Sequence, residues 1–272
     1  MRTWLNGSML EAPDQPAVSV LDHGITVGDG AFETLKAVDG QPFALTRHLQ
    51  RMARSLQGLG LTPPDDALLR EGVAAVLDGE PGDLRVRITV TAGPAPLGSE
   101  RGDSGLTVAV ASAPLGDWPA TTAVATVPWP RNERGALAGL KTTSYAENVV
   151  ALARAHAAGA SEAIFANTVG DLCEGTGSNV FYVLDGEVVT PTLASGCLAG
   201  VTRALVLEWS GGVERDAPVG VLAEADEVFL ASTTRDVQAV HACDGRRFDA
   251  PGPVTATVIK TWAERAASDI DP

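Results

Sequence analysis

The chain has 272 residues, 45% of them hydrophobic, and this length favours two domains that bury a substantial apolar core. Its 34 acidic side chains outnumber its 20 lysines and arginines, which gives a formal charge of −14. Such a negative balance disfavours nucleic acids and anionic membranes, because both require clustered cations. We therefore expect a small-molecule substrate, no nucleic-acid partner and no membrane partner.

The sequence predicts a cytoplasmic protein without a bound metal. No apolar run approaches the ~20 residues that a membrane-spanning helix needs, and residues 1–7 lack the apolar core of a secretory signal. Cys173, Cys197 and Cys243 are odd in number and widely spaced, which suggests reduced thiols rather than disulfides or a metal site. The four histidines show no metal-ligand spacing either.

The first part of the chain predicts strands and two helices separated by glycine-containing turns. Strands are expected at 4–6, 18–21, 31–38, 84–91 and 106–111, and helices at 45–59 and 65–78. Thr46 is placed to cap the first helix, and Asp39-Gly40 predicts a hairpin turn. A loop rich in glycine and proline, residues 93–105, separates the last two strands.

A linker is predicted at 115–121, because two prolines and a glycine interrupt the pattern at 113–121. It would divide an N-terminal α/β domain at 1–114 from a C-terminal domain at 122–272. The second domain is expected to contain strands at 123–127, 162–167, 179–184, 188–189 and 227–231, and helices at 144–158, 202–209 and 254–267. Strands and helices are mixed in both parts, so the predicted fold class is mixed α/β.

Lys141, one of only three lysines, lies in the hydroxyl-rich segment 139–145 between a predicted strand and a predicted helix. A lysine that is held in place and partly desolvated can attack an aldehyde, because its amine loses charge easily. An ordinary surface lysine is the alternative, and it is the commoner case for a lysine considered alone.

Glu174 precedes the glycine-containing loop 175–179, which leads directly into an apolar strand. Backbone without side chains can approach a ligand closely, and a carboxylate facing a pyridine nitrogen would keep that nitrogen protonated. A tight turn stabilised by Glu174 and Asn179 explains the same residues equally well.

Three further segments carry donors suited to a phosphate. Loop 195–200 leads into a helix with Thr202 in its first turn, and helix N-termini bind anions. Thr233 and Thr234 follow a predicted strand, and Arg51 on the first helix offers bidentate donors. Each also has a plain alternative: an N-cap, a Ser/Thr turn and a solvated arginine.

In this order the segments resemble the class IV aminotransferase family. The resemblance extends from residue 6 to about residue 240 and rests on 28–33, 48–51, 140–141, 174–181 and 200–203. It implies the two-domain fold type IV, with an N-terminal α/β sandwich and a pseudo-barrel-like C-terminal α/β domain. It further implies pyridoxal 5′-phosphate as cofactor, and a homodimer whose active site lies between the domains.

The resemblance also implies roles for individual residues. Lys141 is expected to form the Schiff base and to carry the proton, and Glu174 to face the pyridine nitrogen. The donors expected around the phosphate are Arg51, Val201, Thr202, Thr233 and Thr234. Tyr145 is offset by one position from the tyrosine near the cofactor of branched-chain enzymes, so its role stays open.

Two reactions fit the resemblance. Thr34 and the short chain favour a 4-amino-4-deoxychorismate lyase, which releases pyruvate to give 4-aminobenzoate for folate synthesis, and Arg87 stands where that group has a lysine. Glu33 and the absence of a cation at 92–97 favour an amino-acid or amine transaminase. The balance favours the lyase by a small margin. A binding module without catalytic activity is a third, remote interpretation.

The resemblance also implies that Thr34 assists proton transfer and that Glu33 lies at the substrate. Further substrate contacts are suggested by charge alone. The basic candidates for a substrate carboxylate are Arg87, Arg131, Arg134 and Arg235.

Overall fold

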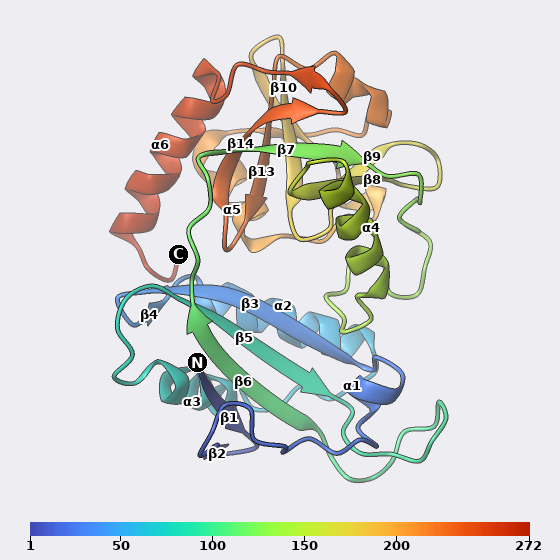
Figure 1. The fold of residues 1–272 in the computed structure, drawn as a ribbon, viewed down its shortest axis with the longest axis vertical. Helices are drawn as coiled ribbons and strands as arrows, with labels where there is room; N and C mark the ends of the chain where they lie inside the picture. Colours follow the sequence, from blue (N-terminus) through green and yellow to red (C-terminus); the bar gives the residue numbers. More distant parts are fainter. The chain divides into compact units, whose positions relative to one another are not determined.

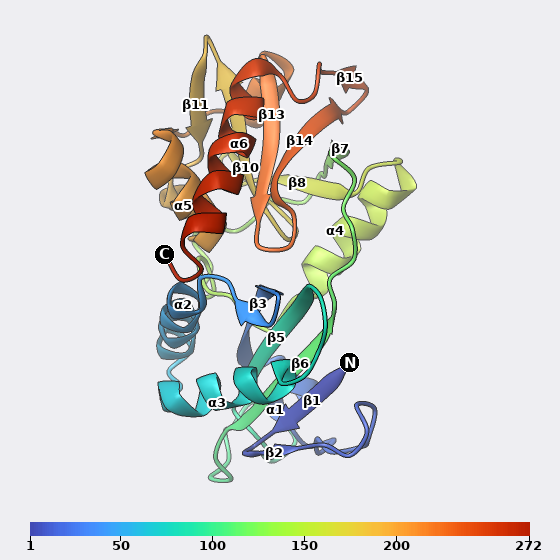
Figure 2. The ribbon, with the colours of Figure 1, turned by 90° about the vertical axis from the view of Figure 1, so that its left-hand side faces the viewer.

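The computed structural model describes all 272 residues, which form two compact units (Figures 1 and 2). Unit 1 comprises Met1–Gly116, Leu140–Tyr145 and Ile270–Pro272, and unit 2 comprises Asp117–Gly139 and Ala146–Asp269. The division differs from the expected one because two later segments pack with unit 1. Phe32 N donates to Lys141 O at 3.0 Å, and Ala44 N donates to Ile270 O at 2.7 Å.

Unit 1 is built on a six-stranded antiparallel sheet with the order β2-β1-β6-β5-β3-β4. Its strands are β1 (Arg2–Leu5), β2 (Ser8–Met9), β3 (Gly30–Val38), β4 (Gln41–Pro42), β5 (Leu84–Thr91) and β6 (Thr107–Pro114). Its helices are α1 (His23–Thr26), α2 (Leu45–Gly58) and α3 (Asp66–Leu77). The predicted hairpin turn at Asp39-Gly40 is present, since Val38 pairs with Gln41.

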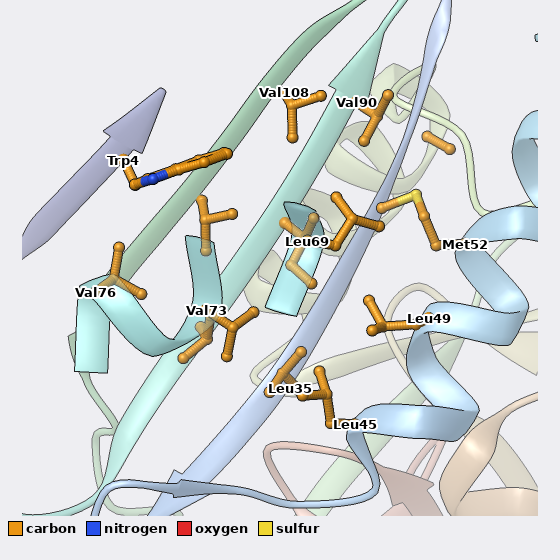
Figure 3. Packing of buried hydrophobic residues seen from close by; sticks show 14 of the residues in the cluster. Trp4, Leu35, Leu45, Leu49, Met52, Leu69, Val73, Val76, Val90 and Val108 are labelled. Carbon is orange, nitrogen blue, oxygen red and sulfur yellow. The ribbon is translucent and has the colours of Figure 1, made fainter. Parts of the chain in front are cut away.

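Alternation along β5 separates a buried face of the sheet from an open one. Leu84, Val86 and Ile88 are buried, whereas Arg85 and Arg87, which alternate with them, are exposed. The buried face packs against apolar side chains of α2 and α3, which Figure 3 shows with Trp4 of β1. Because neighbouring residues of a strand point to opposite faces, the two faces of β3 carry different chemistry.

The start of α2 differs from its prediction. Its N-cap residue is Ala44, in the left-handed region with φ 54°, and no side chain of the N-cap accepts a hydrogen bond. Thr46 is not the cap; its backbone N and its Oγ1 donate to the carboxylate of Asp271, at 2.8 and 2.6 Å. An acceptor 225 residues away cannot be found from local sequence.

Gly72 of α3 provides a first testable prediction. A Cβ there would lie 2.8 Å from Val110 Cγ2 and 2.9 Å from the Trp4 ring. Helix propensity favours alanine over glycine by ~1 kcal/mol, but overpacking a rigid core costs ~1–3 kcal/mol. We expect Gly72→Ala to lower the free energy of unfolding in urea, whereas Gly116→Ala, which has open space, leaves it unchanged or slightly higher.

Unit 2 contains a nine-stranded mixed sheet with the order β12-β11-β10-β13-β14-β7-β8-β9, and β15 pairs with β14. Its strands are β7 (Thr121–Thr126), β8 (Glu162–Ala166), β9 (Leu172–Gly175), β10 (Asn179–Leu184), β11 (Glu187–Thr190), β12 (Val213–Glu214), β13 (Glu227–Ser232), β14 (Asp236–Cys243) and β15 (Arg246–Arg247). β7 runs parallel to both of its neighbours, β14 and β8.

The helices of unit 2 are α4 (Ala146–Ala157), α5 (Val201–Ser210) and α6 (Pro253–Ser268), and short 3-10 turns occur at Leu193–Ser195 and Val219–Ala223. α5 and α6 lie side by side (Figure 2). They contact each other through Trp209 and Trp262, whose ring centroids lie 5.1 Å apart. None of the protein's helices is both long and apolar enough to cross a bilayer.

The mixed α/β class predicted from the sequence is confirmed. The strand expected at 18–21 is absent, and Val18, Val20 and Leu21 are exposed there. The strands β9 and β14 were not predicted, nor were the two-residue strands β2, β4, β12 and β15. α4 begins at Ala146 rather than at residue 144, because the residues before it bond to β3 of unit 1.

Candidate active site

Lys141 lies in an extended segment that pairs with the start of β3. Its carbonyl accepts from Phe32 N, Thr142 forms a bridge with Ala31, and Thr143 N donates to Gly30 O at 2.8 Å. Lys141 N also donates to Ser55 Oγ of α2 at 3.1 Å. The backbone of Lys141 is therefore fixed by both a strand and a helix.

Two aromatic rings surround the Lys141 amine, which is half-buried. Nζ lies 4.4 Å from the centroid of Phe32 and 5.7 Å from that of Tyr145. The two rings meet edge to face, with centroids 5.0 Å apart and planes at 83°. Their faces attract the cationic form of the amine and reduce its contact with water. Tyr145, whose role the sequence left open, thus lies beside Lys141.

Arg87 and Thr34 share the open face of the sheet with Phe32. They are direct cross-strand partners on β5 and β3. The Arg87 guanidinium carbon lies 3.7 Å from the centroid of Phe32. Arg87 is exposed, donates to Thr89 Oγ1 at 3.2 Å and has no carboxylate partner in the chain. Its charge is thus available to an anionic ligand near Lys141.

Glu33 points to the opposite, buried face. Its side chain is fully buried, and both oxygens accept from Arg51, each at 2.7 Å. His48 Nδ1 lies 2.7 Å from Oε2. The expected place of Glu33 at the substrate is corrected, because its carboxylate is enclosed beneath the sheet. Arg51 was expected to bind phosphate; its Nε and Nη2 bind Glu33, and a phosphate contact stays a prediction.

Burial and neighbouring charges have opposing effects on the pKa values of this cluster. Burial raises the pKa of Glu33, but the charge and hydrogen bonds of Arg51, with help from His48, outweigh burial and lower it to about 2. Burial lowers the pKa of His48, and the charges of Arg51 and Lys141 act in the same direction. The cluster therefore contains an ionised Glu33 and a charged Arg51 at neutral pH.

In unit 2, Glu174 lies on β9 opposite Phe165 of β8. Its Oε2 accepts from Leu198 N at 2.9 Å, and its Oε1 lies 3.2 Å from Arg131 Nε. The side chain is 13% exposed. The carboxylate is thus held from two sides while part of its surface remains accessible.

The start of α5 is shaped by Asn179 and Gly200. Asn179 Nδ2 donates to Leu198 O at 2.9 Å, and a Cβ at Gly200 would overlap Asn179 Oδ1. Glycine is therefore required for this close approach, and it leaves α5 without a side-chain cap. The backbone amides of Val201 and Thr202 consequently have no partner in the chain. Free amides at a helix start suit a phosphate.

Thr233 and Thr234 lie half-buried in the turn between β13 and β14. Asn179, which contacts the start of α5, pairs with Ala231 near the end of β13. A shared anion site formed by this turn and the amides of Val201 and Thr202 stays a prediction.

Arg235 differs from its prediction as a substrate contact. Its Nη1 donates to Gln238 Oε1 at 2.7 Å and to Ser161 Oγ at 3.0 Å. Its guanidinium stacks on Trp118 at 3.8 Å, and its side chain is only 7% exposed. Its donors are used within unit 2.

Glu162 is a site-forming residue that sequence reasoning missed. This buried carboxylate accepts from Thr176 N at 2.9 Å, from the Thr176 hydroxyl and from Ser178 Oγ at 3.0 Å. It therefore holds the loop that follows Glu174. A glutamate at the start of a strand, followed by a hydroxyl-rich loop, carries no local signal that the two meet.

Unit 1 thus holds a lysine amine against two aromatic rings, and unit 2 holds a partly accessible carboxylate near a helix start without a side-chain cap. The model of the amino-transferase class IV family matches residues 30–243, and the chain belongs to that family. Members of the family are pyridoxal-phosphate-dependent transferases and lyases.

Individual proteins agree with this assignment. A D-alanine aminotransferase of Bacillus licheniformis is 30% identical over 95% of this chain and 94% of its own length. A bifunctional aminodeoxychorismate lyase / D-amino acid transaminase of Mycobacterium tuberculosis is 29% identical, covering 89% and 91%. The solved structure of the fold IV-transaminase CpuTA1 from Curtobacterium pusillum is 31% identical, with a TM-score of 0.84 over 93% of this chain and 92% of its own.

Proposed function

We propose that the protein is a pyridoxal-phosphate-dependent amino-acid transaminase whose reactive amine is Lys141. One observation carries the proposal: the amine of Lys141 and the guanidinium of Arg87 both contact the ring of Phe32, at 4.4 and 3.7 Å. A reactive amine next to a cation without a carboxylate partner suits a substrate that bears an amino group and a carboxylate close together.

The residues present fit the cofactor. When bound, pyridoxal 5′-phosphate supplies an aldehyde that condenses with amines and a ring that accepts electrons from the neighbouring carbon. Lys141 would hold the aldehyde, Glu174 the pyridine nitrogen, and the free amides of Val201 and Thr202 the phosphate. Arg51, Thr233 and Thr234 remain proposed phosphate donors.

Each of the protein's own side chains at the site has a separate role in the proposed reaction. Lys141 Nζ removes a proton from the substrate carbon and returns it, because it is the basic group beside Arg87. Phe32 and Tyr145 orient Nζ and exclude water from it. Arg87 binds the substrate carboxylate. Glu174 stays negatively charged, which keeps a proton on the nitrogen that it faces.

A lyase acting on aminodeoxychorismate is the second candidate, and the position of Thr34 supports it. Thr34 lies on the open face beside Arg87, where a hydroxyl can assist proton transfer. We rank the lyase second because of the charges that its substrate carries. Its substrate carries two carboxylates, whereas Arg101, the only cation in loop 93–105, is bound to Asp29 at 2.7 Å.

We also propose that the protein acts as a homodimer. Unit 1 exposes a group of apolar side chains, and Ala95 N bonds to Leu21 O, which joins the two segments that bear them. They are Val18, Val20, Leu21, Ile25, Val27 and Leu97. Exposed apolar groups of this kind are usually covered by a partner. Analytical ultracentrifugation showing a monomer at assay concentration would contradict this.

The proposed reaction is tested with the purified holoenzyme. We expect amino transfer from D-alanine or L-leucine to 2-oxoglutarate, and no 4-aminobenzoate or pyruvate from aminodeoxychorismate. Arg87→Met should raise KM for the amino acid ~10-fold or more, because a charge-assisted hydrogen bond is lost. It should leave KM for an amine without a carboxylate unchanged. Formation of 4-aminobenzoate with no amino transfer would establish the lyase instead.

A further inference from the structure

The guanidinium of Arg131 lies against the carboxylate that we assign to the pyridine nitrogen. Arg131 Nε is 3.2 Å from Glu174 Oε1. Arg131 follows β7, and its backbone N donates to Ala166 O at the end of β8 at 2.8 Å. The backbone of Arg131 is therefore fixed to the strand that pairs with β9, which carries Glu174.

The side chain of Arg131 is held as firmly as its backbone. Nη1 donates to Glu147 Oε2 at 2.7 Å and to Asn148 Oδ1 at 3.0 Å, both on α4. The guanidinium carbon lies 4.2 Å from the centroid of Phe165, the cross-strand partner of Glu174. Charge alone suggested that Arg131 binds a substrate carboxylate. Its Nη1 is used by two acceptors on α4, and its buried Nε faces Glu174 Oε1 as an ion pair without a hydrogen bond.

The two oxygens of Glu174 are restrained differently. One accepts from the amide of Leu198 and the other faces the cation of Arg131. The amide fixes the direction of the carboxylate, and an adjacent cation favours its ionised form. A carboxylate that is both oriented and ionised is what a protonated pyridine nitrogen requires, because a neutral acid would leave the proton off the ring.

We propose that Arg131 is a positioning residue for the reaction, which holds Glu174 ionised and oriented without contacting the substrate. The inference rests on the proposed function of Glu174. It separates Arg131 from Arg87, which we assign to the substrate carboxylate. Loss of Arg131 should therefore reduce turnover, whereas loss of Arg87 should reduce substrate binding.

The experiment compares Arg131→Met, Arg131→Lys and the control Arg215→Met as holoenzymes. Arg215 also lies in unit 2, but its side chain is 53% exposed and pairs with Glu187. We expect Arg131→Met to lower kcat ~10-fold or more, the size of effect common for groups that orient a ligand-binding residue. KM should change less than ~2-fold, the visible band of the bound cofactor should titrate at a different pH, and Arg131→Lys should restore part of kcat.

Two results would overturn the inference. One is an unchanged kcat and spectral titration in Arg131→Met; the other is a rise in KM alone, which would make Arg131 a substrate contact. If Arg131→Met does not fold, Arg131→Lys is the deciding variant. It retains the positive charge but cannot contact Glu174 and α4 at the same time as the guanidinium does. An activity of Arg131→Lys equal to that of the wild type would contradict the positioning role. Failure of the proposed function itself would give a different result: borohydride would link no cofactor to Lys141 in the wild-type protein.

Discussion

Replacing Lys141 by alanine is expected to lower the rate of amino transfer by ~10³-fold or more, since the group that attacks the aldehyde and moves the proton is removed. The fold should persist, because the contacts of Lys141 that join unit 1 are made by its backbone N and O. Its Nζ lies half-buried over two rings, and truncation leaves those rings packed on each other. The measurement is the half-reaction with an amino acid, with the unfolding curve recorded in parallel.

Because the chain contains few lysines, replacing another lysine is a decisive control. The chain has only three, and Lys260 on α6 is 77% exposed beside Glu264. Lys260→Ala should retain activity and cofactor. Borohydride reduction of the wild-type holoenzyme should link the cofactor to the peptide that contains Lys141. A label on Lys36 or Lys260, or a Lys141→Ala variant that still turns over at the wild-type rate, would disprove the assignment.

Local sequence predicted the elements whose pattern repeats within one strand or helix. Alternation between Ala31 and Val38 predicted β3, and the helical spacing of Leu49, Met52 and Leu56 predicted α2. Contacts between residues distant in the chain could not be predicted from local sequence. The cap of α2 comes from Asp271, and the segment of Lys141 pairs with β3 across more than a hundred residues. Pairings of this kind depend on the packed fold rather than on propensity.

The candidate site shows the same difference between local motifs and contacts of distant residues. Lys141 and Glu174 could be named because each lies in a distinctive local motif. The contact of Arg131 with Glu174 and the place of Glu162 could not be predicted, because their partners come from distant segments of the chain. The burial of Glu33 did have a signal. Phe32 and Glu33 must face opposite sides of a strand, and His48 and Arg51, three residues apart, share one side of a helix.

Replacing Glu33 by glutamine is expected to cost about 3–5 kcal/mol of unfolding free energy at neutral pH, because the buried Arg51 loses the carboxylate that binds its Nε and Nη2. The effect should be measured by urea denaturation of the protein without cofactor. Asp66→Asn is the matched control, since Asp66 forms an exposed pair with Arg70, and such pairs contribute ~0–1 kcal/mol. Equal stabilities of Glu33→Gln and Asp66→Asn would exclude the buried ion pair as a stabilising element.

The pH dependence gives this prediction a second, independent test. The pKa of Glu33 is lowered from 4.5 to about 2 in the folded protein, so folding favours the ionised carboxylate. The stability that this provides is complete above pH 4.5 and is lost as the pH falls toward 2. The difference between wild type and Glu33→Gln should therefore shrink over this range. Adding Arg51→Met to Glu33→Gln should recover part of the loss at neutral pH, because the buried guanidinium that lost its carboxylate is then removed. A further loss would show that Arg51 stabilises the fold without Glu33.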